Sequence, residues 1–172
     1  MYGKWVVSVV VVAWSYSNIF AELIDTFEVG EGEFTSFMLF QFGNEHQYLY
    51  EVSYSGTKTG RDLFDVVSLA QPDFFEATIE SYSFGDFLVG VTIGEDHDEG
   101  YGTAPEYLDY WHYWTIDDGS DNWGSSMIGF SDRIVHDGSY DGWVFDSNSA
   151  PIPAAPVGFL LAGTILFRRR RG

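Results

Sequence analysis

The chain has 172 residues, of which 45% are apolar and 19% aromatic, enough to bury the core of one globular domain. Its 8 basic residues against 26 acidic ones give a net charge of -18, a field that repels nucleic-acid backbones and excludes nucleic acid as a partner. Because the sequence contains no cysteine, disulfides, thiolate zinc sites and cysteine nucleophiles are excluded as well.

The basic residues gather at the two ends of the chain. Residues 22–150 contain only Lys58, Arg61 and Arg133 against all 26 carboxylates, a net charge of -23. We therefore interpret this segment as one acidic domain, and the two ends as segments with a function separate from that of the domain.

The N-terminal segment has the pattern of a secretory signal peptide. A short positive start, Met1–Lys4, precedes the apolar run Trp5–Trp14 and a small, polar stretch that ends at Ala21. We expect residues 1–21 to be a signal peptide that is cleaved after Ala21 or Ser17. The alternative is a buried N-terminal strand, because the valine-rich run has high β-propensity.

The first predicted elements of the acidic domain are a β-hairpin and a helix. Apolar runs at Phe34–Phe42 and Gln47–Tyr54 flank a turn-type sequence, and in the second run apolar and polar residues alternate. Thr59 and Asp62 have the spacing of a capping box, which predicts the start of a helix. An apolar stripe follows, and Pro72 ends the helix after about three turns. The stripe consists of Leu63, Val66, Val67 and Ala70.

The rest of the domain returns to strand-like patterns. The expected strands are Thr78–Phe84, Phe87–Ile93, Tyr107–Ile116, Met127–Phe130 and Gly142–Phe145, with a hairpin turn at Gly85-Asp86. A hairpin, one helix and then several strands predict an α+β domain that is mostly β. We expect a single antiparallel or mixed sheet with one short packed helix over residues 22–150.

This order of elements resembles the β-grasp-like C-terminal domain of transcobalamin-type proteins. The resemblance is carried by the helix entry at Thr59–Val67, the Tyr-Trp-containing strand at Tyr110–Trp114, and Gly142–Phe145. It implies a β-grasp-like arrangement for the acidic domain.

The aromatic strand is the first candidate site. The period of two places Tyr107, Trp111 and Tyr113 on one face, where exposed rings would stack on sugars or other flat ligands. The alternative is that these rings fill the core, as most aromatic side chains do.

The second candidate site is a calcium loop. Asp137, Ser139 and Asp141 place oxygen atoms at alternate positions before Gly142, as in the first half of such a loop. The twelfth position is Asn148 instead of glutamate, and the alternative is a pair of solvated turns. We expect no cofactor, with calcium as the one ion that the sequence offers.

The C-terminal segment, residues 151–172, has the layout of a membrane anchor. The motif Pro151-Ile152-Pro153 leads into an apolar stretch that ends at Phe167, near the lower length limit of about 17 residues for a bilayer-spanning helix. Four arginines follow and predict that the acidic domain lies outside the cytoplasm, because positive charge stays inside. They are Arg168, Arg169, Arg170 and Arg171.

This tail resembles the PEP-CTERM sorting signal of exopolysaccharide-producing Gram-negative bacteria, which consists of a proline motif, a short apolar helix and a terminal arginine cluster. The resemblance covers Pro151 to Arg171 and implies a surface protein handled by an exosortase-type enzyme, which removes or retains the tail. A plain transmembrane anchor is the alternative. In either case the protein is exported, and stays membrane-anchored or is released to the cell surface or extracellular matrix.

The sequence contains no catalytic motif of the common hydrolase, metalloprotease or nucleotide-binding types, and we expect no enzyme. It predicts a non-enzymatic interaction or structural protein of the cell surface, with the membrane, a sorting enzyme and extracellular polysaccharide as partners. Two alternatives are a small-ligand or glycan-binding module that uses the aromatic strand, and a calcium-stabilised adhesin.

Overall fold

The computed structural model describes residues 21–117 and 122–152, which form an α+β domain dominated by β-strands. Residues 1–20 of the predicted signal peptide and residues 153–172 of the predicted anchor lie outside the described residues. Within the described part, the one helix is neither long nor apolar enough to cross a membrane. The elements in chain order are β1 (Glu22–Gly30), β2 (Phe34–Gln41), β3 (His46–Tyr54), α1 (Gly60–Ala70), β4 (Phe75–Tyr82), β5 (Gly85–Ile93), β6 (Asp96–Glu99), β7 (Trp111–Ile116), β8 (Gly124–Ser125) and β9 (Tyr140–Phe145).

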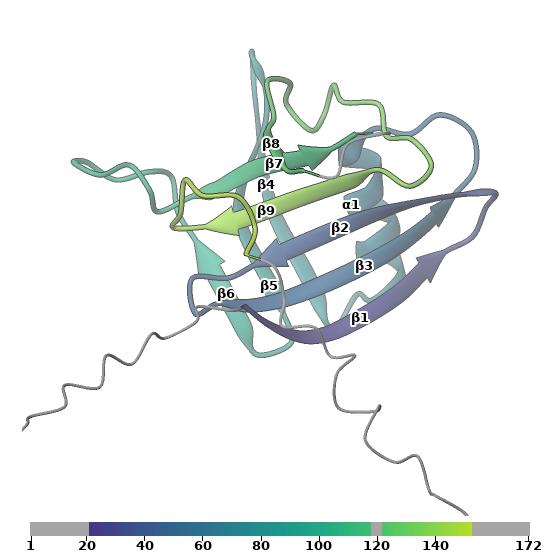
Figure 1. Ribbon diagram of the computed structural model, residues 1–172, viewed down its shortest axis with the longest axis horizontal. Helices are drawn as coiled ribbons and strands as arrows, with labels where there is room; N and C mark the ends of the chain where they lie inside the picture. The colour runs from purple at the N-terminus through teal and green to yellow at the C-terminus, as the bar shows by residue number, and fades with distance from the viewer. Residues whose placement is uncertain (1–20, 118–121, 153–172) are drawn as a thin grey trace, which may run out of the picture.

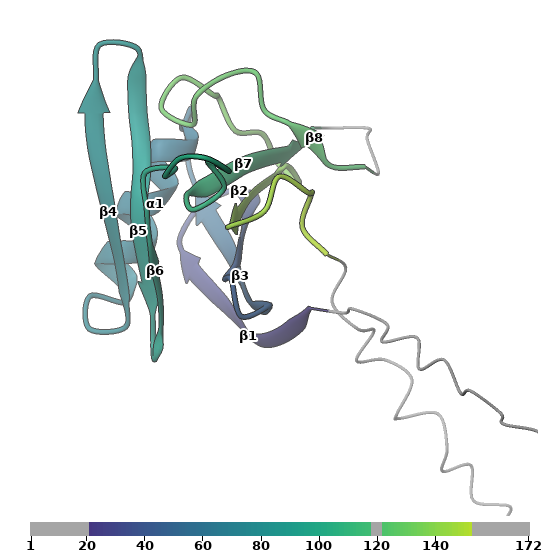
Figure 2. The ribbon, with the colours of Figure 1, turned by 90° about the vertical axis from the view of Figure 1, so that its left-hand side faces the viewer.

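The strands form two sheets, where the sequence predicted one. A mixed six-stranded sheet has the order β1-β3-β2-β9-β7-β8, and an antiparallel three-stranded sheet has the order β4-β5-β6 (Figure 1). The three-stranded sheet and α1 lie on the same side of the six-stranded sheet (Figure 2). The second sheet arises because β4 to β6 pair only with one another, in a meander that follows the helix.

The core lies between these layers and is largely aromatic. Phe40 of β2 stacks on Trp143 of β9 with ring centroids 5.2 Å apart, and Phe64 of α1 meets the same Trp143 edge-on at 5.0 Å. Phe75 of β4 and Trp111 of β7 complete the contacts around Phe40. Because such rings bury large areas in fixed geometries, this cluster joins both sheets and the helix into one core.

The local predictions for β3 and α1 are confirmed. The alternation in β3 turns one face inward, and its four inward side chains are buried: Tyr48, Tyr50, Val52 and Tyr54. At the helix start, the Asp62 N–H donates to Thr59 Oγ1 at 3.2 Å and the Thr59 N–H donates to Asp62 Oδ2 at 2.8 Å, which completes the capping box. The helix ends at Ala70, before Pro72.

The later strands differ from their predicted bounds. The turn between β4 and β5 lies at Ser83 and Phe84, and Gly85 already belongs to β5. Strand β7 begins at Trp111 instead of Tyr107, and residues 127–130 form turns and bends instead of a strand. The sequence reasoning also missed β1, β6 and β8.

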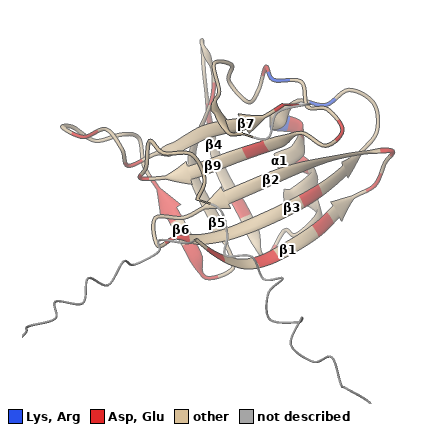
Figure 3. Cartoon of the chain, in the orientation of Figure 1, with Lys and Arg blue, Asp and Glu red and all other residues tan. Residues whose placement is uncertain are grey.

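The outermost strands are short or carry carboxylates. In the six-stranded sheet, β1 carries Glu22, Asp25 and Glu28, and the opposite edge strand β8 has only 2 residues. In the three-stranded sheet, β6 has the sequence DHDE. Acidic residues spread over the strands and loops, whereas the basic side chains of the described part lie near the start of α1 (Figure 3).

Candidate functional site

The three aromatic residues of the predicted platform do not share one exposed face. Trp111 is 3% exposed and packs against Phe42 in the core, and Tyr113 stacks on Trp143 with centroids 5.0 Å apart. Tyr107 is exposed, but it lies in the loop before β7 with a φ of 54°. The period of two holds only inside a strand, and β7 starts too late to include Tyr107.

The three residues of the predicted calcium loop each have a separate protein partner. Asp137 Oδ1 accepts a hydrogen bond from the Thr35 N–H at 2.8 Å, and Ser139 Oγ lies 3.1 Å from Ser36 Oγ. Asp141 is fully buried and bound to other side chains. Across residues 21–117 and 122–152, three or more His, Asp or Glu side chains never gather in a way that would hold a metal ion.

The acidic stretch at β6 accepts hydrogen bonds from the β2–β3 hairpin. Asp96 accepts hydrogen bonds from His46 Nδ1 at 2.8 Å, Tyr48 Oη at 2.7 Å and Asn44 Nδ2 at 2.8 Å. Burial works against ionisation, but these hydrogen bonds outweigh it and hold the pKa of Asp96 below its usual range. At Asp98 burial prevails over the hydrogen bond from the Gly43 N–H, so its pKa is raised. This stretch therefore links the two sheets.

A buried ionic network joins β7, β9 and the loop between β8 and β9. Arg133 Nε donates to Asp141 Oδ1 at 2.6 Å, and Arg133 Nη1 donates to Asp117 Oδ1 at 2.5 Å. The Tyr113 hydroxyl also donates to Asp141 Oδ1. Arg133 is 8% exposed and Asp141 0%, so both charges are removed from water. The Gly60 N–H donates to the Arg133 carbonyl at 3.0 Å, which fixes this loop to the start of α1.

The ionisation of this network is governed by burial and by the ion pairs. Burial raises the pKa of Asp141 against the opposing effects of Arg133 and the Tyr113 hydroxyl. Burial also raises the pKa of Tyr113, and the neighbouring Asp141 raises it further. Burial lowers the pKa of Arg133, but Asp141 and Asp117 outweigh this effect and raise it. Among residues 21–117 and 122–152, two buried atoms of the network have no hydrogen-bond partner, Arg133 Nη2 and Asp141 Oδ2.

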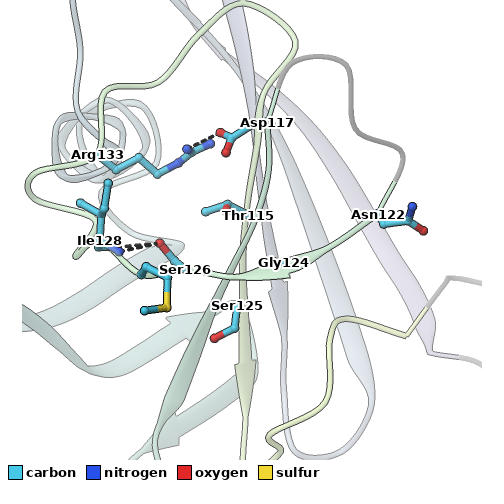
Figure 4. A pocket seen from close by; sticks show the side chains of 9 residues that line it. Thr115, Asp117, Asn122, Gly124, Ser125, Ser126, Ile128 and Arg133 are labelled. Atoms are coloured by element: carbon cyan, nitrogen blue, oxygen red, sulfur yellow. Dashed lines mark hydrogen bonds and ion pairs between the residues drawn. The ribbon is translucent and has the colours of Figure 1, made fainter.

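A pocket of about 340 Å³ is lined by Arg133 together with residues of β7, β8 and the following loop (Figure 4). The guanidinium group of Arg133 extends toward Asp117, with Thr115 of β7 beside the pair (Figure 4). On the other side the loop turns back on itself, because Ser126 Oγ donates to the Ile128 carbonyl at 2.7 Å. Met127 is 96% exposed at this rim. The pocket thus combines one guanidinium, one carboxylate, hydroxyl groups and an apolar rim.

The start of the predicted sorting motif is bound to the outer face of the six-stranded sheet. The Ile152 N–H donates to Gln41 Oε1 at 2.8 Å, and its carbonyl accepts from Gln47 Nε2 at 2.7 Å. Both glutamines are buried, as is Pro151, which packs over Gly142. The other residues of the predicted motif lie outside the described residues: Pro153, Arg168, Arg169, Arg170 and Arg171.

No protein-family model matches the chain, and no curated protein is significantly similar to it. The candidate site therefore rests on geometry. Sequence reasoning named Tyr113 and Asp141, but for a sugar platform and a calcium loop, and it missed the arginine that joins them. The available signal was that Arg133 is one of the three Lys and Arg residues in the segment of charge -23. A buried cation needs a carboxylate partner, but sequence spacing does not tell which one.

Proposed function

We propose that the chain is an exported protein whose acidic domain is anchored to a membrane outside the cytoplasm and has a non-enzymatic interaction or structural role there. The observation that carries this proposal is the contrast along the sequence between the acidic segment of residues 22–150, with a net charge of -23, and the two apolar ends with their basic residues. Within the described residues, the acidic segment forms a folded domain in which the Glu22 N–H donates to the Glu45 carbonyl at 3.0 Å and Ile152 is bound between two glutamines.

The position of the two ends also supports the proposal. Glu22 pairs with His46 in the β1–β3 register, and Ile152 is bound to the adjacent Gln47. Within the described residues, the start of β1 and Ile152 therefore meet at the start of β3. Removal of a leader after Ala21 would keep the whole of β1 (Glu22–Gly30), although it would remove Ala21, which is 1% exposed.

The resemblance of the tail to the PEP-CTERM signal adds a proposed partner, an exosortase-type sorting enzyme. The cell surface or extracellular matrix is then the location of the mature domain, next to the membrane and extracellular polysaccharide. The single helix on a mixed sheet is compatible with the β-grasp resemblance, but the second sheet lies outside that pattern. The proposal therefore draws on the sorting tail and not on the β-grasp likeness.

The test is export and anchoring of the full chain in a Gram-negative host. We expect the protein in the membrane fraction after alkaline carbonate washing, digested by protease added to spheroplasts, with a mature N-terminus at Glu22 after cleavage at Ala21. Replacing the four arginines of residues 168–171 with glutamine should disturb anchoring or orientation. The matched control, Lys58→Gln with Arg61→Gln, removes cations of the folded domain and should leave the distribution unchanged.

Recovery of the uncut chain in the soluble cytoplasmic fraction would refute the proposal. In a host with an exosortase-type enzyme, mass spectrometry of the mature protein separates the two fates of the tail. A mass without the residues after the proline motif indicates processing by the sorting enzyme, and a mass that includes Arg171 indicates a plain anchor.

A further inference from the structure

Aromatic rings gather on the side of the three-stranded sheet that faces away from the core. Tyr82 at the end of β4 stacks on Phe84 of the following turn with ring centroids 5.2 Å apart, and Phe87 of β5 stacks on Tyr101 at 6.3 Å. Glu80 joins the two pairs, because it accepts hydrogen bonds from the hydroxyls of both Tyr82 and Tyr101. We call these four aromatic residues and Glu80 the aromatic face.

The aromatic face is open to solvent. Side chains alternate along β4, so Ile79 packs against the core and Glu80 lies on the opposite side. Tyr82 is 43% exposed, Tyr101 56% and Phe84 77%. One side of the Phe84 ring lies against Tyr82, so the other side is free. Exposed rings that gather at one place, instead of lying singly, mark an interaction surface.

The polar atoms of the aromatic face are left as hydrogen-bond acceptors. Each tyrosine has one hydroxyl proton, and both protons are directed to Glu80. These two hydrogen bonds lower the pKa of Glu80, so the carboxylate stays ionised. The same contact raises the pKa of Tyr101 to about 12, so its hydroxyl keeps its proton at neutral pH. A ligand therefore has to supply the donors.

The charge of the aromatic face selects a cationic ligand. The faces of aromatic rings carry partial negative charge and attract cations, and Glu80 adds a full negative charge among them. The carboxylate of Glu99 also acts on Tyr101. Over longer distances the net charge of -23 on residues 22–150 attracts a polycation and repels a polyanion. An ammonium group satisfies both requirements, because it is positive and only donates.

The composition and position of the aromatic face favour a polysaccharide over a basic polypeptide. A lysine or arginine head group needs only Glu80 and its two tyrosines, whereas Phe84 has no polar atom and offers contact to the C–H face of a neighbouring sugar ring. The face belongs to the three-stranded sheet, and Ile152 is bound to the six-stranded sheet. It is therefore directed away from the proposed anchor (Figure 2).

We propose that the aromatic face binds a polysaccharide that carries free amino groups, with sugar rings stacked on its exposed aromatic rings and an ammonium group bound to Glu80. Glycan binding thereby moves from β7, where Trp111 and Tyr113 are turned into the core, to β4 and the segment after β6. The proposal gives the chemistry of the polysaccharide partner and rests on the proposed export for its location. Binding and export are measured separately, so the failure of one is distinguishable from the failure of the other.

The experiment is calorimetric titration of the full chain, purified in a polyoxyethylene ether detergent, with a β-1,4-linked glucosamine hexasaccharide. Concentrations up to about 10 mM cover dissociation constants near 1 mM. We expect this cationic hexasaccharide to bind, and its N-acetylated counterpart, which has the same rings without the charges, to bind at least about tenfold more weakly. Hexalysine has the same number of side-chain charges without the sugar rings, and should also bind at least about tenfold more weakly.

Two pairs of variants locate the site. Glu80→Gln should weaken binding of the cationic hexasaccharide by about tenfold, because a charge-assisted hydrogen bond is lost, whereas Glu33→Gln, the same change in the exposed turn between β1 and β2, should have little effect. Phe84→Ala should weaken binding by about fivefold through loss of stacking, whereas Leu69→Ala, which removes a side chain of α1 that is 85% exposed, should not. Thermal unfolding checks that all four variants are folded.

Three results would overturn the proposal. The first is failure of the cationic hexasaccharide to bind, and the second is equal binding of its N-acetylated counterpart. The third is unchanged binding by Glu80→Gln or Phe84→Ala. Hexalysine that binds as tightly as the hexasaccharide, with the same loss in Glu80→Gln, would instead assign the aromatic face to a basic polypeptide and so exclude a polysaccharide as its specific partner.

Discussion

Removing Arg133 should destabilise the domain strongly, because Asp141 is the most deeply buried charge of the ionic network. Arg133→Met leaves the Asp141 carboxylate at 0% exposure with the Tyr113 hydroxyl as its remaining partner. Breaking a buried ion pair by deleting one partner costs about 3–5 kcal/mol. Because domains of this size are stable by about 5–15 kcal/mol, the loss is a large fraction of the free energy of unfolding.

A double variant separates the ion pair from packing effects. Arg133→Met with Asp141→Leu removes both charges, so the penalty for an unpaired buried carboxylate disappears. The Tyr113 hydroxyl then lacks its acceptor, which leaves the double variant about 1–3 kcal/mol less stable than the natural protein. The matched control is Arg61→Met, because Arg61 is itself partly exposed in its pair with the exposed Asp65 and lies 3.6 Å from Asp86, so that its loss should cost less than about 1 kcal/mol.

Equilibrium urea unfolding, followed by tryptophan fluorescence, measures these differences, since Trp143 is fully buried. The reasoning is refuted if Arg133→Met lies within about 1 kcal/mol of the natural protein. It is also refuted if the double variant loses the sum of the two single losses, because an ion pair requires the two changes to be non-additive.

Three further predictions concern the helix cap, acid sensitivity and calcium. Thr59→Ala should lower the free energy of unfolding by about 1 kcal/mol through loss of the capping box, whereas Thr57→Ala, an exposed change outside it, should have little effect in the same urea titration. Asp96 stabilises the fold above its unfolded pKa of about 3.9 and loses this contribution as the pH falls through its lowered folded pKa, so Asp96→Asn should flatten the loss of stability in acid. The contribution of Asp98 to stability has the opposite pH dependence: its raised folded pKa gives stability at low pH that is lost as the pH rises through that pKa. Asp98→Asn should therefore remove this loss. Equal effects of the two variants in a pH series of unfolding curves would contradict the assignment. Calcium and a chelator should leave the melting temperature unchanged in a thermal-shift assay, because Asp137 and Asp141 are committed to protein partners, and a clear rise with calcium would disprove this.

The elements that could be predicted from the sequence are those decided by neighbours along the chain. The alternation in β3 and the capping box of α1 involve residues two or three positions apart, and both are found as expected. The predicted face of the helix needed two changes. Leu63 and Val67 are buried as expected, but Phe64 also belongs to the core and Ala70 is exposed. The buried face differs because α1 contacts β1 and β3 of one sheet and β4 of the other.

The missed elements depend on contacts across the fold. Strand β1 is largely exposed and β6 is acidic, so neither has an apolar alternation that would mark it as a strand, although both pair along their length. The candidate site was hidden for the same reason. Arg133 finds Asp117, Asp141 and Tyr113 through the pairing of β7 with β9, and a sequence does not reveal this pairing.

The acidic margins of the two sheets have a consequence for a protein held at high density. The unpaired backbone groups along the edge strands β1 and β6 can hydrogen-bond to a strand of a second copy and so extend the sheet. Fibrous aggregation starts with such an addition. The carboxylates of Glu22, Asp25 and Glu28 meet their own counterparts when two β1 strands approach, and the repulsion keeps neighbouring molecules apart. Many copies can thus lie close together in one layer as separate particles.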